Sequence, residues 1–166
     1  MKNYFSNAKA VALAQVDRGT LDRWVRSGLV TPGIDRGGRG RPRRWSFTDI
    51  VGLRVLSILT RDYGVPPRKV RKLLPLLREY TGSSSSLAAL ARCQLAVTGD
   101  SVVLVRTREA SDLLIDLLDS PGQLLLALVP LEHVIWDLKR RMRELEASEG
   151  SEQKEASALS ARRRSG

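Results

Sequence analysis

The hydrophobic positions of the chain follow two different periods. In the first half, apolar residues recur at spacings of three and four residues, which is the period of an amphipathic helix. In the second half, short apolar runs bounded by turn residues are added, and these are typical of buried strands. We therefore expect a mainly α protein with a small β component.

Two short helices are expected near the N-terminus. The stretch "NAKAVALAQ" has small and apolar residues at helical spacing, and Asp17 is placed as the N-cap of a second helix, "RGTLDRWVRSG". In this second helix Leu21, Trp24 and Val25 share one face, and Gly28 ends it as a C′ glycine. The two helices are separated by about three residues, which is typical of a helix-turn-helix.

Arginine and glycine dominate the segment after the second helix. The run "RGGRGRPRRW" at residues 36–45 holds five arginines, three glycines and one proline, a composition that excludes helix. The following "RRWSF" has aromatic residues at strand alternation, so we expect a two-stranded ribbon with a loose tip, that is, a wing. Its "RGRP" core also matches the AT-hook, in which glycine lets the backbone approach the floor of the minor groove.

Two further helices are expected after the wing. Ser46 and Asp49 have the spacing of a capping box at the start of "FTDIVGLRVLSILTRDYG", which Gly64 ends. The next helix, "PRKVRKLLPLLREY", begins at a Pro-Pro pair, as proline at the first helical position permits. Pro75 lies inside this helix and should kink or shorten it, because proline has no N–H to donate.

The second half is expected to mix strands and helices. "CQLAVTGDSVVLVRT" has the pattern of a hairpin, "REASDLLIDLLDS" that of an amphipathic helix and "GQLLLALVP" that of a buried strand. In "LEHVIWDLKRRMRELEAS" the apolar residues form an a/d seam, which we expect to be a dimer contact, the alternative being that it packs on its own hairpin. The seam residues are Leu131, Ile135, Leu138, Met142 and Leu145.

These patterns divide the chain into four parts. We expect a winged helix-turn-helix domain at 1–80, a serine-rich linker at 81–86, an α+β domain at 87–147 and a disordered tail at 148–166. The fold class is thus mainly α with small β: an N-terminal winged helix-turn-helix domain and a small α+β domain that ends in a dimerisation-type helix.

Charge separates the two halves and suggests a partner. The 166 residues carry a net charge of +10, and residues 1–80 alone hold 17 Lys and Arg against 6 Asp and Glu, a net charge of +11. A basic field concentrated in one part of the chain, and made mostly of arginine, is typical of a module that binds a polyanion. The chain has no apolar run of the ~20 residues that span a bilayer and no signal-peptide pattern, so we expect a cytoplasmic protein associated with the nucleoid.

The sequence offers no set of residues for catalysis or for a cofactor. Cys93 is the one cysteine and His133 the one histidine, so neither a multi-thiolate metal site nor a catalytic triad can be assembled from them. The phosphate-binding loop motifs of nucleotide enzymes are missing as well. We expect neither an enzyme nor a metal or other cofactor, and interpret Cys93 as a buried small side chain and His133 as a partly exposed helix residue.

The first half resembles a known family. "VALAQVDRGTLDRWVRSGLV", followed by "GRPRRWSFTDIVGLRVLSILTRDYGVPPRKVRKLL", is similar over roughly residues 8–80 to the DNA-binding domain of the mercury-resistance-regulator (MerR) family of bacterial transcription factors. The resemblance implies that Thr20-Leu21 opens the recognition helix, that Trp24 packs beneath it, and that the wing arginine is Arg43 or Arg44. The C-terminal half is only loosely similar to uncharacterised MerR-like and antitoxin-type regulators, through "GQLLLALVPLEHVI".

The chain departs from the family pattern in the recognition helix. Asp22 stands where the family usually has an arginine that touches phosphate. We expect Asp22 either to pair with Arg26 or to accept a hydrogen bond from a cytosine amino group. The cysteines that metal-sensing members carry at their dimer helix are also missing here.

These observations together predict a sequence-specific protein that binds double-stranded DNA. We expect a homodimeric transcriptional regulator that places a recognition helix in the major groove and wing arginines on the minor groove or phosphates. Two alternatives stay open: an excisionase-like or architectural factor that bends or segregates DNA, and an autoregulating antitoxin whose C-terminal domain binds a protein partner. The expected DNA-binding residues are Arg18, Thr20, Arg23, Arg26, Arg36, Arg39, Arg41, Arg43 and Arg44.

Overall fold

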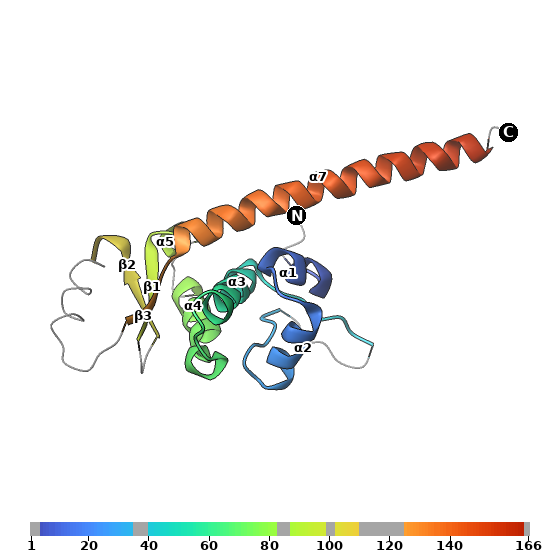
Figure 1. Ribbon diagram of the computed structural model, residues 1–166. Coiled ribbons are helices and arrows are strands. Elements are labelled where there is room, and N and C mark those ends of the chain that lie inside the picture. The colour runs from blue at the N-terminus through green and yellow to red at the C-terminus, as the bar shows by residue number, and fades with distance from the viewer. Residues whose placement is uncertain (1–3, 35–39, 83–86, 99–101, 110–124, 165–166) are drawn as a thin grey trace.

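The protein is mostly helical and carries one small antiparallel sheet. The computed structural model describes residues 4–34, 40–82, 87–98, 102–109 and 125–164. The N-terminal helices pack together beneath one long C-terminal helix, and the sheet lies beside them at the start of that helix (Figure 1). This arrangement confirms a mainly α fold with a small β component.

The first two helices have the expected limits and caps. Helix α1 (Asn7–Ala14) ends at Gln15, whose φ of 53° turns the chain toward α2 (Arg18–Arg26). The Asp17 carboxylate caps α2 by accepting a hydrogen bond of 2.8 Å from the backbone N–H of Thr20. Gly28 follows α2 with a φ of +69°, a conformation that glycine adopts without strain. The predicted helix-turn-helix is confirmed.

Helix α3 (Phe47–Arg61) is the centre of the N-terminal core. The predicted capping box is present, since Ser46 and Asp49 each accept a hydrogen bond from the other's backbone N–H. A Cβ atom at Gly52 would lie 2.9 Å from the side chain of Leu74, so the glycine allows α3 and α4 to approach closely.

Pro75 divides the expected fourth helix into two pieces. A short 3-10 turn, η1 (Pro67–Val70), precedes α4 (Leu73–Gly82). Pro75 is the third residue of α4, where a backbone N–H has no acceptor within the helix, so its missing donor costs nothing there. The prediction of a shortened helix is confirmed, and α4 continues to Gly82, inside the segment expected to be a linker.

The expected wing ribbon differs from the structure. No strand forms among the described residues between α2 and α3, and residues 35–39 at the tip lie outside the described part. Trp45 instead makes an isolated bridge with Phe5, through two backbone hydrogen bonds of 2.8 and 3.0 Å. Of the strand predicted over "RRWSF", Phe47 belongs to α3 because Ser46 caps that helix, whereas Arg44 and Trp45 take part in bridge pairing. The partner strand of the predicted ribbon falls largely on residues 35–39, outside the described residues.

The sheet has three antiparallel strands with β1 (Cys93–Thr98) at its centre. On one side β1 pairs with β2 (Val102–Arg106) and on the other with β3 (Leu125–Pro130), so Leu95 lies between Leu104 and Val129. The predicted hairpin and buried strand are confirmed. The short elements α5 (Leu87–Leu90) and η2 (Thr107–Glu109) flank the hairpin, and the helix expected over "REASDLLIDLLDS" falls almost entirely on residues 110–124, outside the described residues.

Helix α7 (Leu131–Arg164) is longer than expected. Residues 148–164 were expected to be disordered but continue the helix. They are rich in Ala, Glu, Lys and Arg, which are strong helix formers, and they extend a helix that is already nucleated, so they need no apolar face of their own. In the described part of the chain, no helix has both the length and the apolar character needed to cross a membrane.

The predicted dimer seam packs within the chain. Leu131, Ile135 and Leu138 are buried in the protein's own core, and Met142 and Leu145 are partly buried against it. The reason is the course of α7, which crosses α3 and α1 as well as β1 (Figure 1). Packing within the chain therefore accounts for Leu131, Ile135 and Leu138 and partly for Met142 and Leu145, and a dimer contact through these residues stays a prediction.

Candidate nucleic-acid interface

Helix α2 presents an apolar face to the core and arginines to the outside. Leu21 and Trp24 are buried, whereas Arg18, Arg23 and Arg26 are exposed. This division follows from the helical period, because residues three and four apart share a face. The guanidinium groups on the outward face of α2 can therefore contact a ligand. Thr20 is half-buried at the first turn of the helix.

The described wing arginines differ in their surroundings. Arg41 is exposed, whereas the Arg43 guanidinium forms an ion pair with the Asp22 carboxylate of α2. Arg44 points elsewhere, with its guanidinium 4.4 Å from the centre of the Tyr4 ring, a cation–π arrangement. Arg36 and Arg39 lie outside the described residues.

Asp22 has a partner that the sequence did not suggest. We expected Arg26 or a cytosine to meet its carboxylate, but Arg26 donates its Nε to the backbone carbonyl of Asp22 at 3.4 Å, and the carboxylate binds Arg43. The Arg43 hydrogen bond is the main reason why the pKa of Asp22 lies below its ordinary value, and the charges of Arg43, Arg18 and Arg26 add to it against a smaller effect of burial. Asp22 is therefore ionised at neutral pH and surrounded by arginines.

The aromatic residues of this region belong to the core. Trp45 is fully buried and donates its ring N–H to the Asn7 side chain at 3.0 Å. Phe5 and Phe47 pack with their ring centres 6.2 Å apart. Because these rings support the wing base from inside, they are not available to stack on bases.

A buried ion pair fixes the turn that leads into the wing. Asp49 is fully buried, and its carboxylate accepts hydrogen bonds from the backbone N–H of Gly33 and from Arg78 of α4, both at 2.8 Å. Arg78 also donates to the backbone carbonyl of Thr31. Sequence reasoning had assigned Asp49 to the capping box alone, since nothing in the local pattern reveals a partner 29 residues away.

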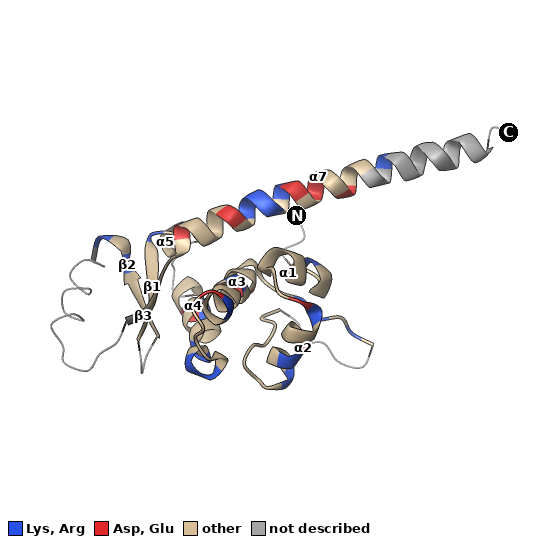
Figure 2. Ribbon diagram, in the orientation of Figure 1, with Lys and Arg blue, Asp and Glu red and all other residues tan. Residues whose placement is uncertain are grey.

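Basic side chains gather on the side of the N-terminal domain that faces away from α7. In Figure 2, Lys and Arg colour parts of α2 and of the region around η1 at the lower side of the domain, and parts of the segment before α3 at its right. The exposed basic residues include Arg18, Arg23 and Arg26 on α2 and Arg41 before α3. Around η1 they are Arg68, Lys69, Arg71 and Lys72.

A family model matches this part of the chain. Residues 5–77 match the model described as "MerR HTH family regulatory protein". Residues 5–77 form a MerR-type helix-turn-helix domain. The match covers α1 through the first part of α4, including the wing segment, and agrees with the resemblance found from the sequence. No curated protein matches the chain.

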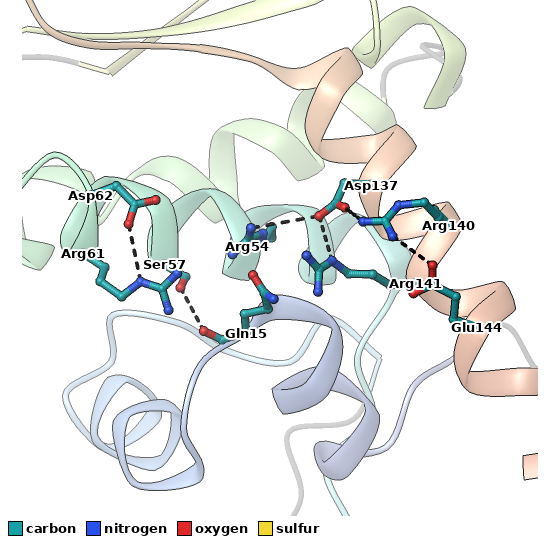
Figure 3. Close-up of polar contacts among 9 residues, drawn as sticks. All are labelled: Gln15, Arg54, Ser57, Arg61, Asp62, Asp137, Arg140, Arg141 and Glu144. Carbon is teal, nitrogen blue, oxygen red and sulfur yellow. Dashed lines mark hydrogen bonds and ion pairs between the residues drawn. The ribbon is translucent and has the colours of Figure 1, made fainter. Parts of the chain in front are cut away.

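The MerR-type domain is joined to α7 by a cluster of charges. Asp137 of α7 receives hydrogen bonds of 2.6 and 2.7 Å from Arg140 and Arg141 and lies 4.0 Å from the Arg54 guanidinium of α3 (Figure 3). Burial, together with the nearby charge of Arg141, lowers the pKa of Arg54. At a second point Lys9 of α1 pairs with Glu149 at 2.9 Å. The domain and the helix are thus held together by polar contacts as well as by the apolar seam.

The remaining candidate residues have ordinary surroundings. Cys93 is buried, with its sulfur 3.3 Å from the Tyr80 hydroxyl, and His133 is exposed on α7. Within the described ranges, His, Cys, Asp and Glu side chains do not come together in a group of three or more that could hold a metal ion.

Proposed function

We propose that this protein is a transcriptional regulator that binds double-stranded DNA in a sequence-specific manner. Helix α2 lies in the major groove, where Arg18, Arg23 and Arg26 read base edges or adjoining phosphates. Arg41 and the other arginines at the wing tip contact the minor groove or its phosphates. The exposed cations around η1 add outer phosphate contacts.

One observation carries this proposal: the match to the MerR regulatory family spans the helix whose outward face is made of exposed arginines. A family match alone supports a regulator of this class, and exposed arginines alone support binding to many polyanions. Their coincidence on α2 favours DNA, because a helix of this size with guanidinium groups fits the major groove. The net charge of +11 over residues 1–80 supports the same conclusion.

Selection from a pool of random duplexes tests the proposal. The full chain should enrich a defined sequence, and Arg23→Ala should lose about 1–3 kcal/mol of discrimination at one base pair while other positions stay selective. Arg71→Ala, a matched loss of charge away from α2, should weaken binding to all sequences alike. A pool that stays random after selection contradicts sequence-specific recognition. Genome-wide footprinting then separates a promoter-binding regulator from an architectural or segregation factor.

We also propose a homodimer, formed by the distal part of α7. This part runs beyond the elements that α7 packs against within the chain (Figure 1), so a second copy of the chain can pack along it. Light scattering of the full chain should report a dimer, and removal of residues 151–166 should give monomers. Dimers that survive the truncation place the contact elsewhere. A different small protein that co-purifies with the chain instead favours the antitoxin alternative.

A further inference from the structure

The Asp22–Arg43 ion pair joins the two parts of the proposed DNA interface. Asp22 belongs to the outward side of α2, and Arg43 is 21 residues later, at the base of the wing. About a third of the Asp22 side chain and a quarter of the Arg43 side chain are exposed (34% and 27%). The pair is therefore a surface contact between α2 and the segment that carries the wing.

Folding stability does not explain a pair of this kind. Ion pairs that are partly exposed to water contribute little to the free energy of unfolding, because water screens them and two long side chains must be ordered. An acid on a DNA-facing surface also opposes binding, since it repels phosphates. Asp22 therefore reduces affinity for DNA in general, and its role must lie in something other than affinity.

The wing base is held from both sides. Arg43 is bound to α2 through Asp22, Arg44 lies over the Tyr4 ring, and the next residue, Trp45, is buried and paired with Phe5. Three consecutive residues are thus attached to two parts of the domain: Arg43 to α2, and Arg44 and Trp45 to Tyr4 and Phe5 of the segment before α1. Of these attachments, the Arg43 contact is the one that fixes the wing base relative to the recognition helix.

We propose that Asp22 is a specificity-determining residue that acts through Arg43. Resting on the proposed function, the inference is that the ion pair holds α2 and the wing base in one relative orientation, so that only a duplex whose groove contacts and phosphates fit both parts is bound tightly. The free carboxylate that remains when the pair opens repels the phosphates of a duplex that does not fit. Arg43 then serves as the partner of Asp22, and Arg41 as the phosphate contact.

Two substitutions that break the same pair with opposite changes of charge test this role. Asp22→Asn removes a negative charge and Arg43→Gln removes a positive one. The measurement is the dissociation constant of the full chain for its selected duplex and for a scrambled duplex at one salt concentration. Asp22→Asn should bind the scrambled duplex about fivefold more tightly, the effect expected for one charge near a phosphate in water, and Arg43→Gln should bind it more weakly. In both variants the ratio of the dissociation constant for the scrambled duplex to that for the selected duplex should fall.

Controls separate this role from charge and from folding. Asp62→Asn removes an acid paired with Arg61 at the end of α3 and should leave the ratio unchanged. Arg41→Ala should raise the dissociation constants for both duplexes by the same factor. The double variant Asp22→Asn/Arg43→Gln should have a ratio no lower than either single variant, because the two residues act as one unit. Thermal unfolding of each variant should match that of the unchanged protein.

The results that overturn the inference are distinct from those that overturn the function. If the unchanged protein discriminates between the duplexes and Asp22→Asn or Arg43→Gln keeps the full ratio, the pair has no part in specificity. Effects of the two substitutions that add in the double variant also contradict action through a shared contact. If the unchanged protein binds no duplex, the proposed function fails, and this inference fails with it.

Discussion

Arg78 of α4 binds the fully buried carboxylate of Asp49 at the start of α3, with its Nη2 2.7 Å from Oδ1. The other carboxylate oxygen accepts the backbone N–H groups of Gly33 and Ser46, both at 2.8 Å. One side chain thus joins the capping of α3, the docking of α4 and the turn before the wing. The turn that leads from α2 into the wing segment is fixed by this contact, because Arg78 and Asp49 bind the backbone of Thr31 and Gly33.

Arg78→Ala should destabilise the protein strongly. The substitution leaves the buried carboxylate of Asp49 without its cation, a change that costs about 3 kcal/mol in comparable sites. Urea denaturation followed by circular dichroism measures the loss. The control is Arg71→Ala, which removes an exposed arginine and should change the free energy of unfolding by no more than about 0.5 kcal/mol. Equal stability of the two variants would show that the contact does not hold the domain together.

Gly33→Ala should also be destabilising, for a steric reason. A Cβ atom at Gly33 would lie 2.9 Å from Oδ2 of Asp49, closer than side chains approach without a shift. Gly150→Ala is the matched control, and it should raise stability instead of lowering it. A Cβ atom at Gly150 in α7 would meet nothing within 4 Å, and alanine is favoured over glycine in a helix by up to about 1 kcal/mol. Thermal melting should therefore shift down for the first variant and not for the second. Two shifts of the same sign contradict this account of Gly33.

Features that are local in the sequence were predicted well. The Asp17 cap, the Ser46 capping box and the effect of Pro75 each depend on residues within one helical turn of each other, so their spacing is visible in the sequence. Among the candidate site residues, the exposed arginines of α2 follow from the helical period alone.

Features that depend on distant partners were not predictable. The partners of Asp22 and Asp49 lie 21 and 29 residues away, and no local pattern reveals them. The apolar stripe of α7 has the same spacing whether it packs on a second copy or on the chain's own core. The sequence pattern around Leu138 therefore could not distinguish a dimer contact from packing within the chain. The length of α7 was underestimated because the polar residues 148–166 were expected to be disordered. The helix propensity of residues 148–164 nevertheless lets them extend α7.

The packing of α7 predicts a loss of stability where the sequence had suggested a loss of dimers. Leu138 is fully buried, so Leu138→Ala should lower the free energy of unfolding by about 2–5 kcal/mol. Trp136→Ala on the exposed face of the same helix should have an effect within about 0.5 kcal/mol. Denaturant titration gives both values. Light scattering completes the test. If Leu138→Ala is as stable as the unchanged protein but monomeric, Leu138 belongs to a dimer contact instead of the core.

The charge cluster between α3 and α7 predicts a dependence of stability on pH. Burial alone would raise the pKa of Asp137, but hydrogen bonds from Arg141 and Arg140 outweigh it and hold the pKa below the ordinary value of 3.8. A carboxyl with a lowered pKa stabilises the fold above its ordinary pKa and loses that effect as the pH falls through the lowered value. The melting temperature of the unchanged protein should exceed that of Asp137→Asn at neutral pH, and the gap should close below pH 3.8. A gap that persists or widens in acid contradicts this role.

The most direct test of the account is the salt dependence of binding to the selected duplex. If α2, the wing and η1 meet one stretch of DNA, the logarithm of the binding constant should fall linearly with the logarithm of salt concentration, by about 0.9 for each phosphate contacted. Arg41→Ala should make that slope shallower by about one unit. Fluorescence anisotropy with a labelled duplex measures both. Binding that does not respond to salt, or no binding to duplex DNA at all, would contradict the central claim.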